Sequence, residues 1–115
     1  SYFLPYLVGQ AKARELPFTA PVITGQQAYE FGLVNQVADA DGYEAMVGET
    51  AAQLAAMPTV ALGYMKGNLN ASYTGTLSQA LDREAAGMAR CFTTDDHKNA
   101  AKAFVEKRAP EFHGR

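Results

Sequence analysis

Helix-start signals recur along this 115-residue sequence and restrict its fold more than any other feature. Thr24 is followed three residues later by Gln27, and Thr76 is followed in the same way by Gln79. In such a capping box each of the two side chains accepts a hydrogen bond from a backbone amide that the start of a helix leaves free. Gly32 stands where the first of these helices should end, because glycine takes the left-handed cap conformation without strain. Both stretches therefore predict helices with defined ends.

The remaining segments also favour helices. Asp41 and Glu44 can start a helix that Pro58 ends, and residues 59–73 carry apolar side chains at helical spacing. Residues 95–108 begin with two aspartates and end with a lysine and an arginine. These charges suit a helix dipole at both of its ends.

Strand signals are nearly missing from the sequence. Only residues 34–38 (VNQVA) could be extended, and they are too short to build a sheet. Pro17 lacks an amide hydrogen and is expected to end or kink the first helix. No internal repeat or linker divides the chain. We therefore expect an all-α fold of five or six helices, as a single unit over residues 1–115.

Charge and composition argue against several classes of protein. The formal net charge of -2 and the pI near 5.6 do not fit general nucleic-acid binding. No stretch approaches the ~18 apolar residues of a membrane span. Cys91 is the single cysteine, and no Cys/His cluster has zinc spacing. We expect a cytoplasmic protein without a metal site that binds neither nucleic acid nor membrane.

No convincing catalytic group can be named from the residues. His97 and His113 both lie in polar stretches, without the serine or cysteine and carboxylate that a nucleophilic triad needs. Asp95 and Asp96 are better explained as helix-start charges than as an acid/base pair. Glu84 lies on the apolar side of its helix, where burial could raise its pKa and make it an acid. A salt bridge to a neighbouring helix is the interpretation we favour for Glu84.

The stretch LPYLVGQAKARELPFTAPVITGQQAYEFGLVNQVAD, residues 4–39, follows the outline LPxxVGxxxAxxLxxTGxxIxxxxAxxxGLVxxVV. That outline is typical of the enoyl-CoA hydratase/isomerase (crotonase) superfamily, which the sequence resembles. The resemblance continues through ALGYMK and TLSQALDREA and ends at AFVEKRAPEF, residues 103–112. It covers the whole chain in order, and GLVNQV and AFVEKR are its most specific parts. Ala20 stands where the family usually has glycine, and Asn99 and Ala100 where it commonly has Glu-Gly.

The resemblance implies that the chain is the C-terminal helical region of a crotonase-type enzyme. Family members are roughly twice as long or more, and their N-terminal β/α spiral holds the oxyanion-hole amides and the catalytic carboxylates. With that core absent, the chain should be catalytically incomplete, and the reaction of the parent enzyme is not identified. The implied partners are an acyl-CoA thioester, the remainder of the parent enzyme, and further copies in a trimer or paired trimers. No cofactor is implied beyond the coenzyme A part of the substrate.

A free-standing helical interaction module is the alternative, because it would need the same amphipathic helices and no catalytic residue. If the chain is a fragment, its helices lack the core on which they pack, and we expect unusually large exposed apolar surface, including four residues near the start of the chain. These are Tyr2, Phe3, Leu7 and Val8.

The ending AFVEKRAPEFHGR carries the candidate binding residues. In the family, the phenylalanine and lysine of this signature lie near the coenzyme A nucleotide, which implies substrate binding by Phe104 and Lys107. An aromatic ring can stack on adenine, and an ammonium group can pair with a phosphate. Their spacing of three predicts one side of the final helical turns. The alternative is that Phe104 belongs to the core and Lys107 only complements the helix dipole. Arg108 is the weaker candidate because it points to the next face.

Overall fold

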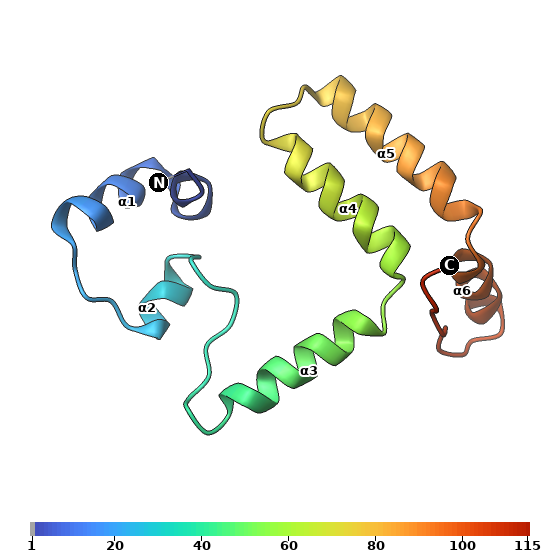
Figure 1. Cartoon of the computed structure of the whole chain (residues 1–115), viewed down its shortest axis with the longest axis horizontal. Coiled ribbons are helices and arrows are strands. Elements are labelled where there is room, and N and C mark those ends of the chain that lie inside the picture. Colours follow the sequence, from blue (N-terminus) through green and yellow to red (C-terminus); the bar gives the residue numbers. More distant parts are fainter. Residues whose placement is uncertain (1) are drawn as a thin grey trace. The chain divides into compact units, whose positions relative to one another are not determined.

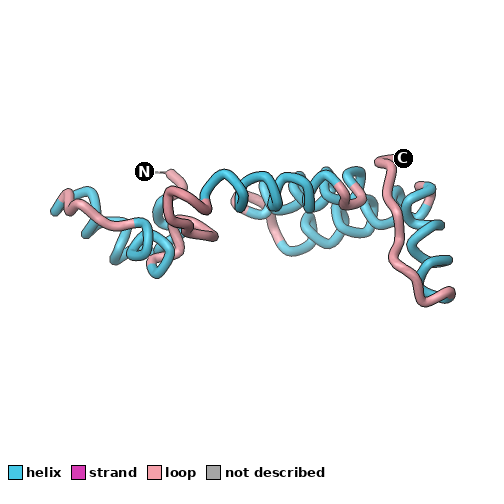
Figure 2. The backbone as a smooth tube through the Cα atoms, turned by 90° about the horizontal axis from the view of Figure 1, so that it is seen from below, coloured by secondary structure: helices cyan, strands magenta, loops and turns pink. Residues whose placement is uncertain are grey.

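The structure is a computed structural model and describes residues 2–115. Over these residues it contains six α-helices and no β-strand. Figure 1 labels the helices, and Figure 2 shows the loops that join them. The expected all-α fold of five or six helices is thereby confirmed. Contacts divide the chain into two compact units, Ser1–Val47 and Gly48–Arg115, with the division inside the third helix. The expectation of a single domain over residues 1–115 stays a prediction.

The first helix of the first unit, α1 (Leu4–Thr19), consists of two helical segments. Gly9 separates them, because its φ of 75° and ψ of 165° lie outside the helical region. The kink expected at Pro17 is wrong: the helix continues through the proline and ends at a left-handed Ala20. Pro17 donates no backbone hydrogen bond, but the helix closes behind it, with the Ala20 amide donating to the Leu16 carbonyl at 2.9 Å.

The second helix, α2 (Gly25–Glu30), has the boundaries that its sequence signals predict. The capping box at Thr24 is formed in both directions, and Gly32 adopts the expected left-handed conformation with φ 78°. The Lys12 ammonium lies 4.8 Å from the centre of the Phe31 ring, which connects α1 to the end of α2. Such a cation over an aromatic face is attracted by the ring's negative charge density.

The start of α3 (Tyr43–Ala55) differs from the expectation. Asp41 was expected to cap this helix, but Gly42 directly precedes its first residue. The Asp39 carboxylate instead accepts a hydrogen bond from the Gly42 amide at 2.8 Å. An aspartate closes a turn through an amide two or three residues later, and Asp39 has that spacing to Gly42. Residues 34–38 form no strand.

In the second unit, α4 (Thr59–Ser72) and α5 (Leu77–Phe92) form an antiparallel pair, visible in Figure 1. The capping box at Thr76 starts α5 as predicted. The last helix, α6 (Asp95–Val105), contacts α5. After α6 the chain turns back, and residues 109–115 return along this helix, with the C-terminus close to it in Figure 1.

Little of the described chain is buried. Three residues are fully enclosed, all in α5 or α6: Gly87, Asp96 and Ala103. Large apolar side chains remain exposed, as expected for the start of the chain, where Phe3 is 65% and Leu7 51% exposed, whereas Val8 is half-buried. None of the helices in residues 2–115 is both long and apolar enough to cross a membrane.

Candidate functional site

Phe104 lies in the last turn of α6 and points away from the helix packing. It is 85% exposed, and the next residue, Val105, is 80% exposed. Ala103, immediately before them, is completely buried. This step from buried to exposed shows which side of α6 faces its neighbours. Within residues 2–115, Phe104 is therefore a surface residue, and the core alternative does not apply there.

Lys107 lies just beyond α6, in a tight turn that closes the helix. Its φ is 55°, in the left-handed region, and its amide donates to the Phe104 carbonyl at 3.2 Å. The Arg108 amide donates to the Ala103 carbonyl at 3.0 Å. These two bonds define a Schellman motif, which usually has glycine at the left-handed position. We call residues 106–108, centred on Lys107, the Lys107 turn.

The expectation that Lys107 and Phe104 share the final helical turns is wrong for Lys107. The helical hydrogen-bond pattern stops at the Glu106 cap, and Lys107 follows in a non-helical conformation. The two residues nevertheless stay close in the backbone, because the Schellman motif folds the Lys107 amide onto the Phe104 carbonyl.

The charged groups around the Lys107 turn are mostly paired with one another. Glu106 lies 2.7 Å from the Arg108 Nε and 3.8 Å from the Lys102 ammonium. The hydrogen bond from Arg108 lowers the pKa of the Glu106 carboxyl, with a smaller contribution from the Lys102 charge. Burial acts in the opposite direction on this pKa. The Glu106 carboxylate is thus held in its ionised form by its two cationic neighbours.

Arg108 is occupied by contacts within the chain. Besides the Nε contact to Glu106, its Nη1 donates to the Ala109 carbonyl at 3.2 Å and its Nη2 to the Asn99 Oδ1 at 3.0 Å. By contrast, the Lys107 side chain forms no ion pair or hydrogen bond with any residue that the structure describes. An ammonium group without a partner among the described residues therefore follows three positions after an exposed aromatic ring.

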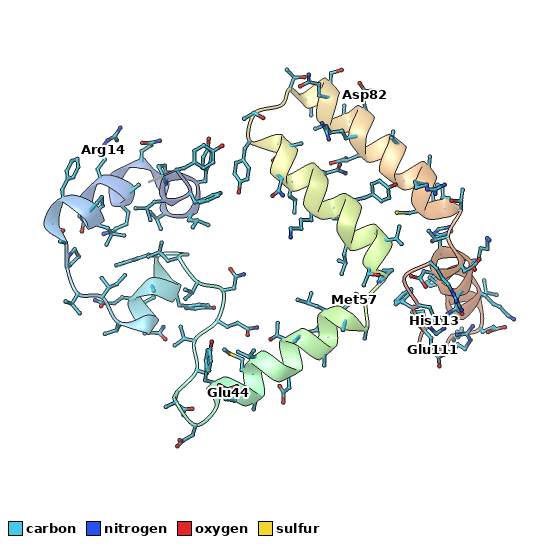
Figure 3. The ribbon with its side chains drawn as sticks, viewed as in Figure 1. Arg14, Glu44, Met57, Asp82, Glu111 and His113 are labelled. Atoms are coloured by element: carbon cyan, nitrogen blue, oxygen red, sulfur yellow. The ribbon has the colours of Figure 1, made fainter. Side chains whose placement is uncertain are left out.

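The other titratable residues form no catalytic arrangement in the described chain. The His97 ring packs on Phe92 with ring centres 4.6 Å apart, and Cys91 is half-buried in α5. His113 lies on the returning tail (Figure 3), where its backbone amide donates to the Asp96 carboxylate. Among residues 2–115 no group of three or more His, Cys, Asp or Glu side chains could hold a metal ion.

Glu84 lines a groove of about 470 Å³ between α4 and α5, whose walls are mainly apolar. The salt bridge that we favoured for Glu84 is not formed within the part of the chain that the structure describes. The side chain is exposed rather than buried, so the burial considered for Glu84 from the sequence is not found. Glu84 therefore has no assigned partner in this groove.

Two polar residues of α6 have a larger structural role than the sequence indicated. Asp96 is only 3% exposed and holds the returning tail, and Asn99 contacts both that tail and Arg108. The sequence predicted only that Asp96 is a charge at the start of a helix. Asp96 does lie in the first turn of α6, and it also binds the tail. Its partners lie 17 and 18 residues later, where no local pattern could point to them.

Comparison with known proteins gives a consistent answer. A family model for enoyl-CoA hydratase/isomerase matches residues 1–115. The chain belongs to the enoyl-CoA hydratase/isomerase family. It is 31% identical over 115 residues to 1,2-epoxyphenylacetyl-CoA isomerase of Escherichia coli, covering 100% of this chain and 44% of that protein. It is 33% identical to crotonyl-CoA hydratase of Syntrophomonas wolfei, covering 95% of this chain and 42% of that protein.

Solved structures of the enoyl-CoA hydratase/isomerase family share the fold of the chain. The enoyl-CoA hydratase/isomerase of Cupriavidus metallidurans superimposes with a TM-score of 0.90 at 32% identity, covering 98% of this chain and 43% of that one. The chain thus spans less than half the length of these relatives. The part of the family that it represents is helical, as the resemblance to the C-terminal region implied.

Proposed function

We propose that this chain is the C-terminal helical part of an acyl-CoA-processing enzyme, in which Phe104 and Lys107 bind the nucleotide of coenzyme A. The observation that carries the proposal is the exposed Phe104 ring in the last turn of α6, followed three residues later by a lysine in a left-handed turn that forms no ion pair among the described residues. The names of relatives support the substrate class, since both compared enzymes act on a coenzyme A thioester. Coenzyme A enters as part of the substrate, and no separate cofactor is proposed.

The chemistry of the two side chains suits this ligand. An ammonium group without an internal partner gains most from a phosphate, because it gives up no existing ion pair. A phenyl ring can stack on adenine, an interaction worth ~1–3 kcal/mol per base in nucleic-acid complexes. Arg108 is not proposed as a ligand group, because its guanidinium is already bonded to three acceptors.

The decisive experiment compares coenzyme A with 3'-dephospho-coenzyme A by calorimetry, using the longest form of the protein that its gene encodes. Lys107→Ala should weaken binding of coenzyme A by ~1–3 kcal/mol, the size of a hydrogen bond to a charged group. It should affect the dephospho form much less. Lys98→Ala is the matched control, because that lysine is exposed on α6, the helix that precedes the Lys107 turn, and pairs with Asp95 at 3.0 Å. Equal losses for both ligands in Lys107→Ala would refute the phosphate contact.

Phe104 is tested separately with adenine-containing ligands. Phe104→Ala should weaken binding of coenzyme A by ~1–3 kcal/mol if the ring stacks on the base, and of pantetheine by much less. Val105→Ala is the control, because Val105 is adjacent and comparably exposed. The same loss for coenzyme A and pantetheine would contradict stacking on adenine.

We further expect the 115-residue chain alone to be catalytically incomplete, with the remainder of the parent enzyme and further copies of it, in a trimer or paired trimers, as partners. Among the residues that the structure describes, no group of three or more His, Cys, Asp or Glu side chains could hold a metal ion, and the single cysteine, Cys91, is half-buried in α5. Purified chain should hydrate a short 2-enoyl-CoA no faster than buffer does. A rate that persists through repurification would show that the catalytic groups lie within these residues.

The helical interaction module stays as a second candidate, and the exposed apolar side chains of the described chain favour it. The two candidates differ in ligand and in size. A module should have no affinity for coenzyme A, and the protein isolated from its native source should have the mass of this chain. Coenzyme A binding by a longer protein would decide against the module.

A further inference from the structure

The Asp96 side chain is an unusual group in this little-buried chain. It is 3% exposed, although it is a carboxylate at the start of a surface helix. Its Oδ1 accepts a hydrogen bond from the His113 amide at 2.7 Å, and its Oδ2 accepts one from the Gly114 amide at 2.9 Å. The Asp96 amide in turn donates to the Arg115 carbonyl at 3.0 Å. A buried carboxylate is tolerated only with such partners, so the end of the chain is required to keep Asp96 satisfied.

The tail is shaped to fit this position. Gly114 has φ 72°, and a Cβ atom there would lie 2.6 Å from the Thr59 hydroxyl at the start of α4. A larger residue would be excluded both by the left-handed backbone and by this close approach. Phe112 lines a small cavity of about 150 Å³ together with residues from the start of α4 and from α5 and α6. The tail is therefore seated against three helices of the second unit.

Asn99 extends this contact from the tail to the Lys107 turn. Its Nδ2 donates to the Glu111 carbonyl, and its Oδ1 accepts from the Arg108 Nη2 at 3.0 Å. One side chain thus holds both the tail and the residue that follows Lys107. We call Asp96, Asn99 and residues 111–115 the C-terminal clasp; Figure 3 shows Glu111 and His113 on the tail beside α6.

The Lys107 turn needs such support. For a residue with a side chain, the left-handed conformation costs roughly 1–2 kcal/mol, and it persists only where the surroundings determine it. At Lys107 the determining contacts are the two Schellman bonds and the fixed guanidinium of Arg108. Asn99, which accepts from Arg108 and donates to the Glu111 carbonyl, connects the turn to the clasp residues of the tail. Loosening the clasp should therefore let the turn sample other conformations.

We propose that Asp96 and Asn99 are positioning residues that hold the Lys107 turn in its ligand-binding conformation through the C-terminal clasp. This role rests on the proposed function of Lys107. Neither residue touches the ligand in this proposal. Asp96 fixes the end of the tail, Asn99 fixes Arg108 and the middle of the tail, and Arg108 is thereby kept from competing with Lys107 for the phosphate.

The test uses the longest encoded form of the protein and two variants that open the clasp in different ways. Asn99→Ala removes both contacts of the bridging amide, and truncation after Pro110 removes residues 111–115 while leaving α6 and the Lys107 turn in place. Each should reduce the ratio of affinities for coenzyme A and 3'-dephospho-coenzyme A by about 5-fold or more, the lower end of the effect of one charged hydrogen bond. Amide hydrogen exchange at Arg108 should become faster, because its bond to Ala103 opens more often.

Lys98→Ala again serves as the control, since it alters the same helix without touching the clasp. If Asp96 and Asn99 had a merely structural role, the clasp variants would have a lower melting temperature and would bind both ligands more weakly by the same factor. The affinity ratio would then be unchanged. That result, or unchanged exchange at Arg108 in both variants, would overturn the proposal. If Lys107→Ala reduces the ratio and the clasp variants do not, the positioning role fails while the proposed function stands. If Lys107→Ala itself has no effect on the affinity ratio, the proposed function of Lys107 and the positioning role of the clasp are both refuted.

Discussion

Gly87 of α5 lies directly against Tyr64 of α4. A Cβ atom at Gly87 would come within 3.4 Å of both the Cβ and the Cδ1 of Tyr64. Gly87 is also one of the few buried residues of the described chain, so this is where the two helices approach each other without an intervening side chain. The antiparallel pair of α4 and α5 therefore depends on the absence of a side chain at this position.

Gly87→Leu should separate these helices. Inserting a large side chain into a packed contact costs typically ~1–3 kcal/mol, and we expect a loss of unfolding free energy of that size. Gly67→Ala on α4 is the control, because a Cβ atom there meets nothing within 4 Å. It should stabilise the chain by roughly 0.5–1 kcal/mol through higher helix propensity. Urea unfolding followed by circular dichroism measures both, and a stabilising Gly87→Leu would contradict the described packing.

Ala20 offers a test in the first unit. It has φ 43° and ψ 49° at the C-terminal end of α1, where its amide donates to the Leu16 carbonyl at 2.9 Å. Ala20→Gly should remove left-handed strain of ~1–2 kcal/mol, of which the greater flexibility of unfolded glycine cancels roughly half. We expect a net gain of about 0.5–1 kcal/mol and a higher melting temperature. Ala11→Gly, at an exposed helical position of α1, should lower it instead.

The signals that predicted structure correctly are local ones. The capping boxes at Thr24 and Thr76 bring together groups three residues apart, so the sequence alone contains both partners. Gly32 likewise ends its helix by a conformational preference of its own. The break in α1 was assigned to Pro17 and not to Gly9, because proline has the stronger general penalty. The non-helical residue inside α1 is Gly9, and Pro17 lies within the helix without breaking it.

The candidate site combines local and distant determinants. Phe104 and Lys107 could be named from the AFVEKR signature, but the left-handed turn at Lys107 could not, because a lysine gives no sign of that conformation. Asp96 suits a helix start whether or not a tail binds it. Its pairing with Gly114 spans 18 residues and depends on the path of the whole second unit. The contacts of residues 111–115 with α6 could therefore be identified only from the structure.

The Glu106 carboxyl should respond measurably to loss of its neighbour Arg108. Its pKa lies below the ordinary value of 4.5, first because Arg108 donates a hydrogen bond to the ionised form. Arg108→Ala should therefore raise this pKa towards 4.5, and Lys102→Ala should raise it less, because that ammonium lies at 3.8 Å. Carboxyl chemical shifts followed by NMR between about pH 2 and 6 report the change, since carboxyl groups titrate in this range.

The sign of the linked stability follows from the lowered pKa. A carboxyl group that is more acidic in the folded state contributes its full stabilisation above the unfolded pKa and loses it as pH falls through the folded one. Any contribution from the Glu106–Arg108 pair is therefore present above pH 4.5 and disappears in more acidic solution. A pH dependence that is identical in the wild-type chain and Arg108→Ala would show that the pair has no linkage to folding.

The exposed apolar stripe of α5 should make the isolated 115-residue chain associate with itself. Leu77 is 76%, Leu81 56% and Met88 58% exposed, and their spacing of four and seven places them on one side of the helix. Contiguous apolar surface of this kind normally has a partner, and at high concentration another copy of the chain is the partner available. Sedimentation velocity should therefore show a mass that rises with protein concentration.

Charged substitutions distinguish this effect from general loss of solubility. Replacing Leu77 and Leu81 together by lysine should reduce the association, because it removes apolar surface from the stripe and adds like charges that repel. The double variant Ala86→Lys and Ala89→Lys adds the same charge to another side of α5, where both residues are exposed, and should reduce association much less. Equal effects of the two pairs would attribute the association to net charge, and an ideal monomer at every concentration would show that the stripe needs no partner.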